Sequence, residues 1–170
     1  MLMLTRTASL TPRTEEFCAR IRPDIKPLSM AIRPERGCEP NECFSSVQKR
    51  VLRDGGRIQC GWSIWEWPGV YLEAEYHAVY APPDGSPWID LSPSPIPEIT
   101  HRLFLPDDAI AEYDFANEGV RRENIREALA DDARIQRFFR IVEQKNAILN
   151  SIPGFDETSL KGQQRSNCNA

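Results

Sequence analysis

Residues 71–92 limit the possible folds of this chain more than any other segment. The first half alternates apolar and polar side chains, which is the period of a β-strand, and it puts His77 on the same face as Glu75. Residues 82–85 read Pro-Pro-Asp-Gly, a combination typical of tight β-turns. The chain then returns as Trp-Ile-Asp-Leu-Ser at residues 88–92. We therefore predict a β-hairpin that carries a histidine on an acidic face.

The centre of the turn decides which residue lies opposite His77. A turn centred between Pro83 and Asp84 places His77 directly across from Asp90, with Cβ atoms about 4.5–5.5 Å apart. A centre one residue further on places Ser92 opposite His77 and leaves Asp90 on the diagonal of the same face. Either register sets an imidazole beside a carboxylate, which is half of a nucleophilic site.

Cys43 is the candidate for the missing nucleophile. The sequence predicts a helix that starts at Asn41, a good N-cap residue, and stops at Gly55. Cys43 falls in its first turn, where unpaired amides and the helix dipole stabilise a thiolate and can also bind an oxyanion. Cys38 remains a second candidate nucleophile, although it precedes the expected helix start.

The order of these residues resembles that in a known superfamily. A Cys at a helix start, followed by a His strand and an Asp strand, resembles the papain-like and transglutaminase-like cysteine hydrolases and transferases. The segments Glu-Tyr-His-Ala-Val-Tyr and Trp-Ile-Asp-Leu look most like those of the protein N-terminal glutamine amidohydrolases. The resemblance covers residues 41–92 and implies Cys43 as nucleophile, His77 as base and Asp90 as orienting acid. Where the papain branch has a Gln shortly before the Cys, this chain has Gly37-Cys38.

The resemblance implies a thiol-dependent amide hydrolase or acyl transferase. We expect it to act on a peptide or protein, with a glutamine side chain or an N-terminal residue as the group attacked, and to need no cofactor and no metal. All four tryptophans lie in the strands around this hairpin. We interpret Trp65 and Trp67 as walls of a substrate cleft, with core packing as the alternative, and Glu75 as a ligand for a substrate amino group.

Two other functions fit some of the same residues. Thiolates and an imidazole could bind a structural zinc ion through Cys38, Cys43, Cys60 and His77. A non-catalytic binding module with an aromatic groove is the third interpretation. The metal content of the purified protein separates the first from the triad.

The remaining patterns predict an α+β fold of the papain-like or transglutaminase-like type. We expect a small antiparallel sheet with the Cys43 helix on its N-terminal side and C-terminal helices packed on it. Further strands are expected over residues 26–34, 58–67 and 99–105. The expected helices outside the site are a short one from Pro12 to before Pro23, one over residues 120–129, and one from about Asp131-Asp132 to Asn150.

Length and composition bound the remaining properties. The 170 residues fit one domain over residues 26–153, with an N-terminal extension, partly disordered, over 1–25 and a disordered tail over 154–170. A net charge of -4 without a basic cluster argues against nucleic acid as a partner. No apolar run reaches the about 20 residues that cross a bilayer. An odd number of cysteines and an apolar start too short for a secretory signal favour a reduced, cytoplasmic protein; the oligomeric state is not predicted.

Overall fold

A computed structural model describes residues 5–40, 42–94, 96–109 and 122–152 of the chain. These residues form an α+β fold with a six-stranded antiparallel sheet and three helices. In chain order the elements are β1 (Arg6–Thr7), α1 (Pro12–Ile21), β2 (Leu28–Ala31), α2 (Cys43–Asp54), β3 (Arg57–Trp67), β4 (Tyr71–Ala81), β5 (His101–Pro106), β6 (Ile125–Ala128) and α3 (Ala133–Asn150). The strands are ordered β2-β5-β3-β4-β6, and β1 pairs with the end of β3. The α+β class is therefore confirmed.

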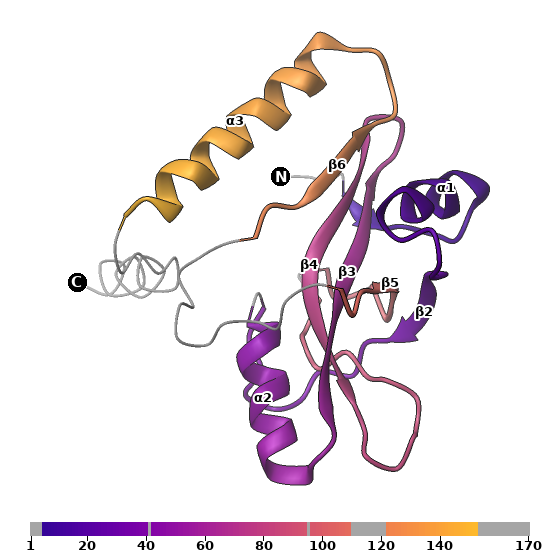
Figure 1. Ribbon diagram of the computed structural model, residues 1–170, viewed down its shortest axis with the longest axis vertical. Helices are drawn as coiled ribbons and strands as arrows, with labels where there is room; N and C mark the ends of the chain where they lie inside the picture. The colour runs from indigo at the N-terminus through magenta and orange to yellow at the C-terminus, as the bar shows by residue number, and fades with distance from the viewer. Residues whose placement is uncertain (1–4, 41, 95, 110–121, 153–170) are drawn as a thin grey trace. The chain divides into compact units, whose positions relative to one another are not determined.

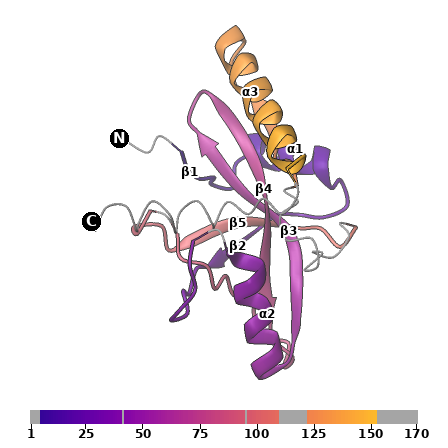
Figure 2. The same ribbon diagram turned by 90° about the vertical axis from the view of Figure 1, so that its left-hand side faces the viewer.

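The β3–β4 hairpin is the longest pairing in the sheet. Each strand has 11 residues, and they are in register from Arg57 opposite Ala81 to Trp67 opposite Tyr71. Gly69 has a φ of 72°, a left-handed conformation that a glycine adopts without strain in the tight turn. Figure 1 and Figure 2 both place α1 toward this turn and α2 along the opposite half of the hairpin. The hairpin thus carries a different helix at each end.

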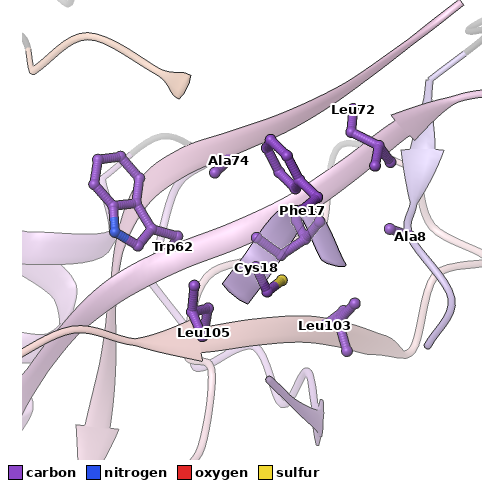
Figure 3. Close-up of a cluster of buried hydrophobic side chains, with 9 residues drawn as sticks. Ala8, Phe17, Cys18, Trp62, Leu72, Ala74, Leu103 and Leu105 are labelled. Carbon is purple, nitrogen blue, oxygen red and sulfur yellow. The ribbon is translucent and has the colours of Figure 1, made fainter. Parts of the chain in front are cut away.

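One face of the sheet packs against α1, and we call it the α1 face. Its buried residues come from both helix and strands, and Figure 3 draws them. They are Ala8, Phe17, Cys18, Trp62, Ile64, Leu72, Ala74, Leu103 and Leu105. Complete burial of a large aliphatic or aromatic side chain stabilises a fold by about 1.5–3 kcal/mol, so this face contributes much of the stability. Cys18 is fully buried here, and burial, reinforced by Glu15, raises the pKa of its thiol to about 11.

The N-terminal residues belong to the sheet unit. Thr11 caps α1 as expected, because its hydroxyl accepts from the Thr14 amide while the Thr14 hydroxyl accepts from the Thr11 amide. Pro12 occupies the first turn. β1 pairs with β3, so elements within residues 1–25 contribute to the sheet and to its core.

The expected helix over residues 120–129 is wrong where the structure describes it. Ile125–Ala128 forms β6, which pairs antiparallel with Tyr71–Ala74. The physical reason is that the edge of β4 offers unpaired backbone groups, and Arg126 also forms an ion pair with Glu73 at 2.7 Å across this edge. Residues 120 and 121 of the expected helix are not among the described residues.

The chain divides into two compact units. The first contains the sheet, α1 and α2, and the second contains α3. α3 starts where expected, because the carboxylate of Asp132 accepts from the amide of Arg134 and caps the first turn. That C-terminal helices pack on the sheet stays a prediction, and the expected tail over residues 154–170 lies beyond the last described residue.

Candidate active site

The sheet face opposite the α1 face carries the predicted chemistry, and we call it the site face. Cross-strand pairing puts Gly61 of β3 opposite His77 of β4, and Ser63 opposite Glu75. β5 adds Phe104, paired with Ser63, to the same face. Successive strand residues alternate between faces, so the predicted grouping of His77 with Glu75 follows directly from the strand period. The first arm of the predicted hairpin is confirmed as β4.

The second arm is much shorter than predicted. Within residues 88–92, only Ile89 pairs with β4, opposite Tyr80, with backbone hydrogen bonds of 2.9 and 3.0 Å. This is the second of the two registers considered, in which Asp90 is diagonal to His77. The chain leaves the hairpin at Asp90, whose carbonyl accepts from the Arg33 amide at 2.8 Å. Residues 88–92 therefore form a bridge between β4 and the end of β2 rather than a strand.

This bridge places Asp90 against His77. The Nε2 atom of His77 lies 3.1 Å from Oδ2 of Asp90, an ion-pair contact without the alignment of a hydrogen bond. Both side chains are buried, with exposed fractions of 5% for His77 and 0% for Asp90. The other oxygen of Asp90, Oδ1, accepts from the Ser92 amide at 2.9 Å. The predicted His–Asp pair is thus present in the fold.

The two groups change each other's protonation. Burial by itself lowers the pKa of His77, but the negative charge of Asp90 and the nearby Cys43 together outweigh it and raise that pKa. Burial raises the pKa of Asp90, and the charges of His77 and Arg102 with the Ser92 amide outweigh it, so the pKa of Asp90 is lowered. Both shifts favour a charged imidazolium–carboxylate pair.

Cys43 is the first residue of α2. The capping position is Glu42, one residue later than the predicted Asn41, and it makes no side-chain capping bond; Asn41 itself is not among the described residues. Ser46 is the first residue of the helix whose amide bonds back along it, to the Glu42 carbonyl at 3.0 Å. The Cys43 side chain is 7% exposed and close enough to His77 to raise its pKa. Cys43 therefore lies within electrostatic reach of the His77–Asp90 pair, and its role as nucleophile stays a prediction.

Sequence reasoning missed Arg102, a fourth charged group at this site. Its Nε atom lies 2.7 Å from Oδ2 of Asp90, and its Nη1 donates to the Ser63 hydroxyl at 3.0 Å. The guanidinium also lies over the ring of Trp65, 5.3 Å from the ring centre. The side chain is 4% exposed. The available signal was a lone arginine inside an apolar strand, since a buried cation needs a partner.

The predicted substrate residues lie at different distances from the triad. Trp65 and Glu75 contact each other through a hydrogen bond from Nε1 to Oε2 of 2.7 Å, and Trp65 reaches the triad through Arg102. Trp67 pairs with Tyr71 beside the hairpin turn, and their ring centres are 5.9 Å apart. Trp67 lies six positions along β3 from Gly61, the residue opposite His77, which is a distance of roughly 20 Å. The structure does not bring Trp67 to the site.

Gly61 makes room for an aromatic neighbour of His77. A Cβ atom at Gly61 would lie 2.4 Å from the Leu105 carbonyl oxygen and 2.5 Å from Cζ of Phe104. The ring of Phe104 meets that of His77 edge-on, with ring centres 6.4 Å apart. The glycine therefore lets Phe104 pack against the imidazole.

The described residues give no support to a zinc site. No group of three or more His, Cys, Asp or Glu side chains in residues 5–40, 42–94, 96–109 and 122–152 is arranged to hold a metal ion. Cys38 and Cys60 are partly exposed, and the other histidine of the chain, His101, is exposed. None of the described helices combines the length and apolar character needed to cross a membrane.

Comparison of the chain with protein-family models, with curated proteins and with solved structures found no significant match.

Proposed function

We propose that this protein is a thiol-dependent amide hydrolase or acyl transferase with a Cys43–His77–Asp90 triad. The observation that carries the proposal is the placement of His77, whose Nε2 faces Asp90 at 3.1 Å while Cys43 is near enough to raise the pKa of the ring. Asp90 occupies Nε2, so Nδ1 is the ring nitrogen that remains for the thiol proton. This division of the two nitrogens is what a nucleophile–base–acid relay needs.

The reaction proceeds through a thioester. His77 is the imidazolium that balances the Cys43 thiolate, and the sulfur attacks the carbonyl carbon of an amide, with the amides of the first turn of α2 facing the developing oxyanion. The carbon–nitrogen bond breaks as His77 returns the proton to the leaving nitrogen, which departs as ammonia or an amine. Water or an acceptor amine then attacks the thioester, and the thiol of Cys43 is restored.

The burial of Cys43 favours a slender substrate group. With 7% of the side chain exposed, a primary carboxamide at the end of a flexible side chain reaches the sulfur more readily than the middle of a polypeptide backbone. The finer proposal is accordingly a glutamine carboxamide, either N-terminal or internal. Glu75 would bind an amino-terminal charge through Oε1, because Trp65 occupies Oε2.

Ammonia release from short peptides tests the proposal. The purified full chain is incubated with a peptide that has an N-terminal Gln and with one that has an internal Gln. We expect release from at least one, its loss in Cys43→Ser and His77→Gln, and full retention in the matched control Cys38→Ser. Retained activity in Cys43→Ser, or loss of activity in Cys38→Ser, would show that Cys43 is not the nucleophile.

Chemical modification tests the thiol without a known substrate. The rate of alkylation of each cysteine by iodoacetamide is followed against pH by peptide mass spectrometry. We expect Cys43 to react well below the unperturbed thiol pKa of about 8.5, and to lose that reactivity in His77→Gln. Cys60 provides the internal control. An inert or ordinary Cys43 would contradict the proposed function.

A further inference from the structure

Arg102 competes with His77 for a single carboxylate oxygen. Its Nε lies 2.7 Å from Oδ2 of Asp90, and Nε2 of His77 lies 3.1 Å from the same atom. Neither contact is aligned as a hydrogen bond, although all three side chains are buried. Two buried cationic groups therefore share one negative charge, which is an expensive arrangement unless a second negative charge is near.

A thiolate at Cys43 would supply that second negative charge. With Arg102 present, a site holding a neutral Cys43 thiol, a protonated His77 and an ionised Asp90 has a net charge of plus one. Loss of the thiol proton brings this buried group to neutrality. Without Arg102 the same loss would take a neutral site to a net charge of minus one, which burial opposes.

We propose that Arg102 is a positioning residue that neutralises Asp90, so that the positive charge of His77 is balanced by a Cys43 thiolate. The inference rests on the proposed function, because it concerns the same Cys43–His77 pair. It goes beyond the triad in assigning the ionisation of the nucleophile to a fourth residue on β5. Ser63 and Trp65 keep the guanidinium beside Asp90, through the 3.0 Å hydrogen bond and the ring contact.

The groups around His77 and Arg102 come from β2, β3, β4, α2 and the bridge after β4. On β4 the nearest charged neighbour of His77 along the strand is Glu75, which accepts from Trp65. On β3 the residue opposite His77 is the uncharged Gly61. Met30 of β2 pairs with Arg102 and is apolar, and α2 contributes Cys43. Asp90, from the bridge after β4, is the carboxylate that Arg102 and His77 share.

The test is the pH dependence of Cys43 alkylation in the full chain carrying Arg102→Met. We expect the midpoint of the alkylation profile to rise by about one pH unit or more, which lowers the rate at the wild-type midpoint about fivefold or more. Arg102→Lys retains the charge and should stay close to wild type. Ser63→Ala removes one of the two contacts that hold the guanidinium but no charge, and should raise the midpoint less than Arg102→Met does.

A double variant guards against misfolding of the single one. Arg102→Met with Asp90→Asn removes one positive and one negative charge, so the net charge of the site equals that of wild type for every protonation state of Cys43 and His77. We expect its midpoint to return toward the wild-type value. A merely structural role for Arg102 would give no such return, and would overturn the inference.

The possible failures are distinguishable. If Cys43 reacts at low pH in a His77-dependent manner and Arg102→Met leaves the midpoint unchanged, the inference is wrong and the proposed function stands. If wild-type Cys43 shows no His77-dependent reactivity, the proposed function is wrong and the inference is overturned with it. Circular dichroism of each variant confirms that the compared chains are folded.

Discussion

The two faces of the sheet are similarly buried, but the α1 face buries apolar side chains and the site face also buries charged and polar ones. On the α1 face, Ile64 and Leu72 are at most 1% exposed and belong to the apolar cluster that packs against α1. On the site face, Asp90 and Ser63 are fully buried, and Arg102 is 4% exposed. Burial stabilises the first group outright, whereas charged groups recover their lost hydration only through each other. The stability of the site face therefore depends on charge balance, and that of the α1 face on packing.

The largest effect should come from removing the shared carboxylate. Asp90→Asn keeps the shape of the side chain but leaves His77 and Arg102 without their common counter-charge. Breaking a buried ion pair in this way costs about 3–5 kcal/mol of the free energy of unfolding at neutral pH. Urea unfolding measures it, with Ile64→Val on the α1 face as the matched control at about 0.5–1.5 kcal/mol. If Asp90→Asn lost no more stability than Ile64→Val, the two faces would not differ in the way proposed.

The site face should also carry a pH dependence that the α1 face lacks. The pKa of His77 is raised to about 10 in the folded chain, by the charge of Asp90 and Cys43 against the opposing effect of burial. Its contribution to stability is therefore complete below the unfolded pKa of about 6.5 and is lost as the pH rises through the folded pKa. Between about pH 7 and pH 9, wild type should lose about 2 kcal/mol relative to His77→Gln.

Thermal unfolding at a series of pH values measures this loss. His101→Gln, which changes an exposed histidine on β5, is the control and should track wild type throughout. A parallel pH profile for wild type and His77→Gln would show that His77 titrates alike in the folded and unfolded chains.

A smaller effect is expected from closing the space beside Phe104. Gly61→Ala places a methyl group 2.4 Å from the backbone oxygen of Leu105, which cannot move as a side chain can. Overpacking of this kind costs about 1–3 kcal/mol, and here it pushes Phe104 toward His77. We expect lower stability together with a changed pH profile of Cys43 alkylation. Cys60→Ala, at the neighbouring position, should leave the alkylation profile unchanged.

The smallest effect separates the two predicted substrate tryptophans. Trp65→Phe removes the hydrogen bond to Glu75, a loss of about 0.5–1.5 kcal/mol, and loosens the stacking that holds Arg102. Trp67→Phe alters a ring near the hairpin turn and should leave both kcat/KM on an active glutamine peptide and Cys43 alkylation unchanged. Equal effects of the two substitutions would show that Trp67 also contributes to the site.

Local patterns predicted most elements of the sheet unit. Alternation identified β4 and β3, prolines bounded the edge strand β2, and Thr11-Pro12 marked the start of α1. These features depend on the side-chain period and on backbone geometry, which a few neighbouring residues determine. β6 was predicted wrongly as helix, because its conformation depends on the free edge of β4, about fifty residues earlier in the chain.

The sequence by itself determined which residue types are available to the site, including a helix-start Cys43 and a strand His77 close to Asp90. Only the tertiary structure decided that the chain crosses from β4 to β2 at Asp90 and that β5 delivers Arg102 to the same oxygen. The physical reason is that periodicity assigns a residue to a face of its own strand, whereas its partners there depend on which strands lie side by side. That arrangement is chosen by burial of the whole sheet, so the charge balance of the site could not be read from any one segment.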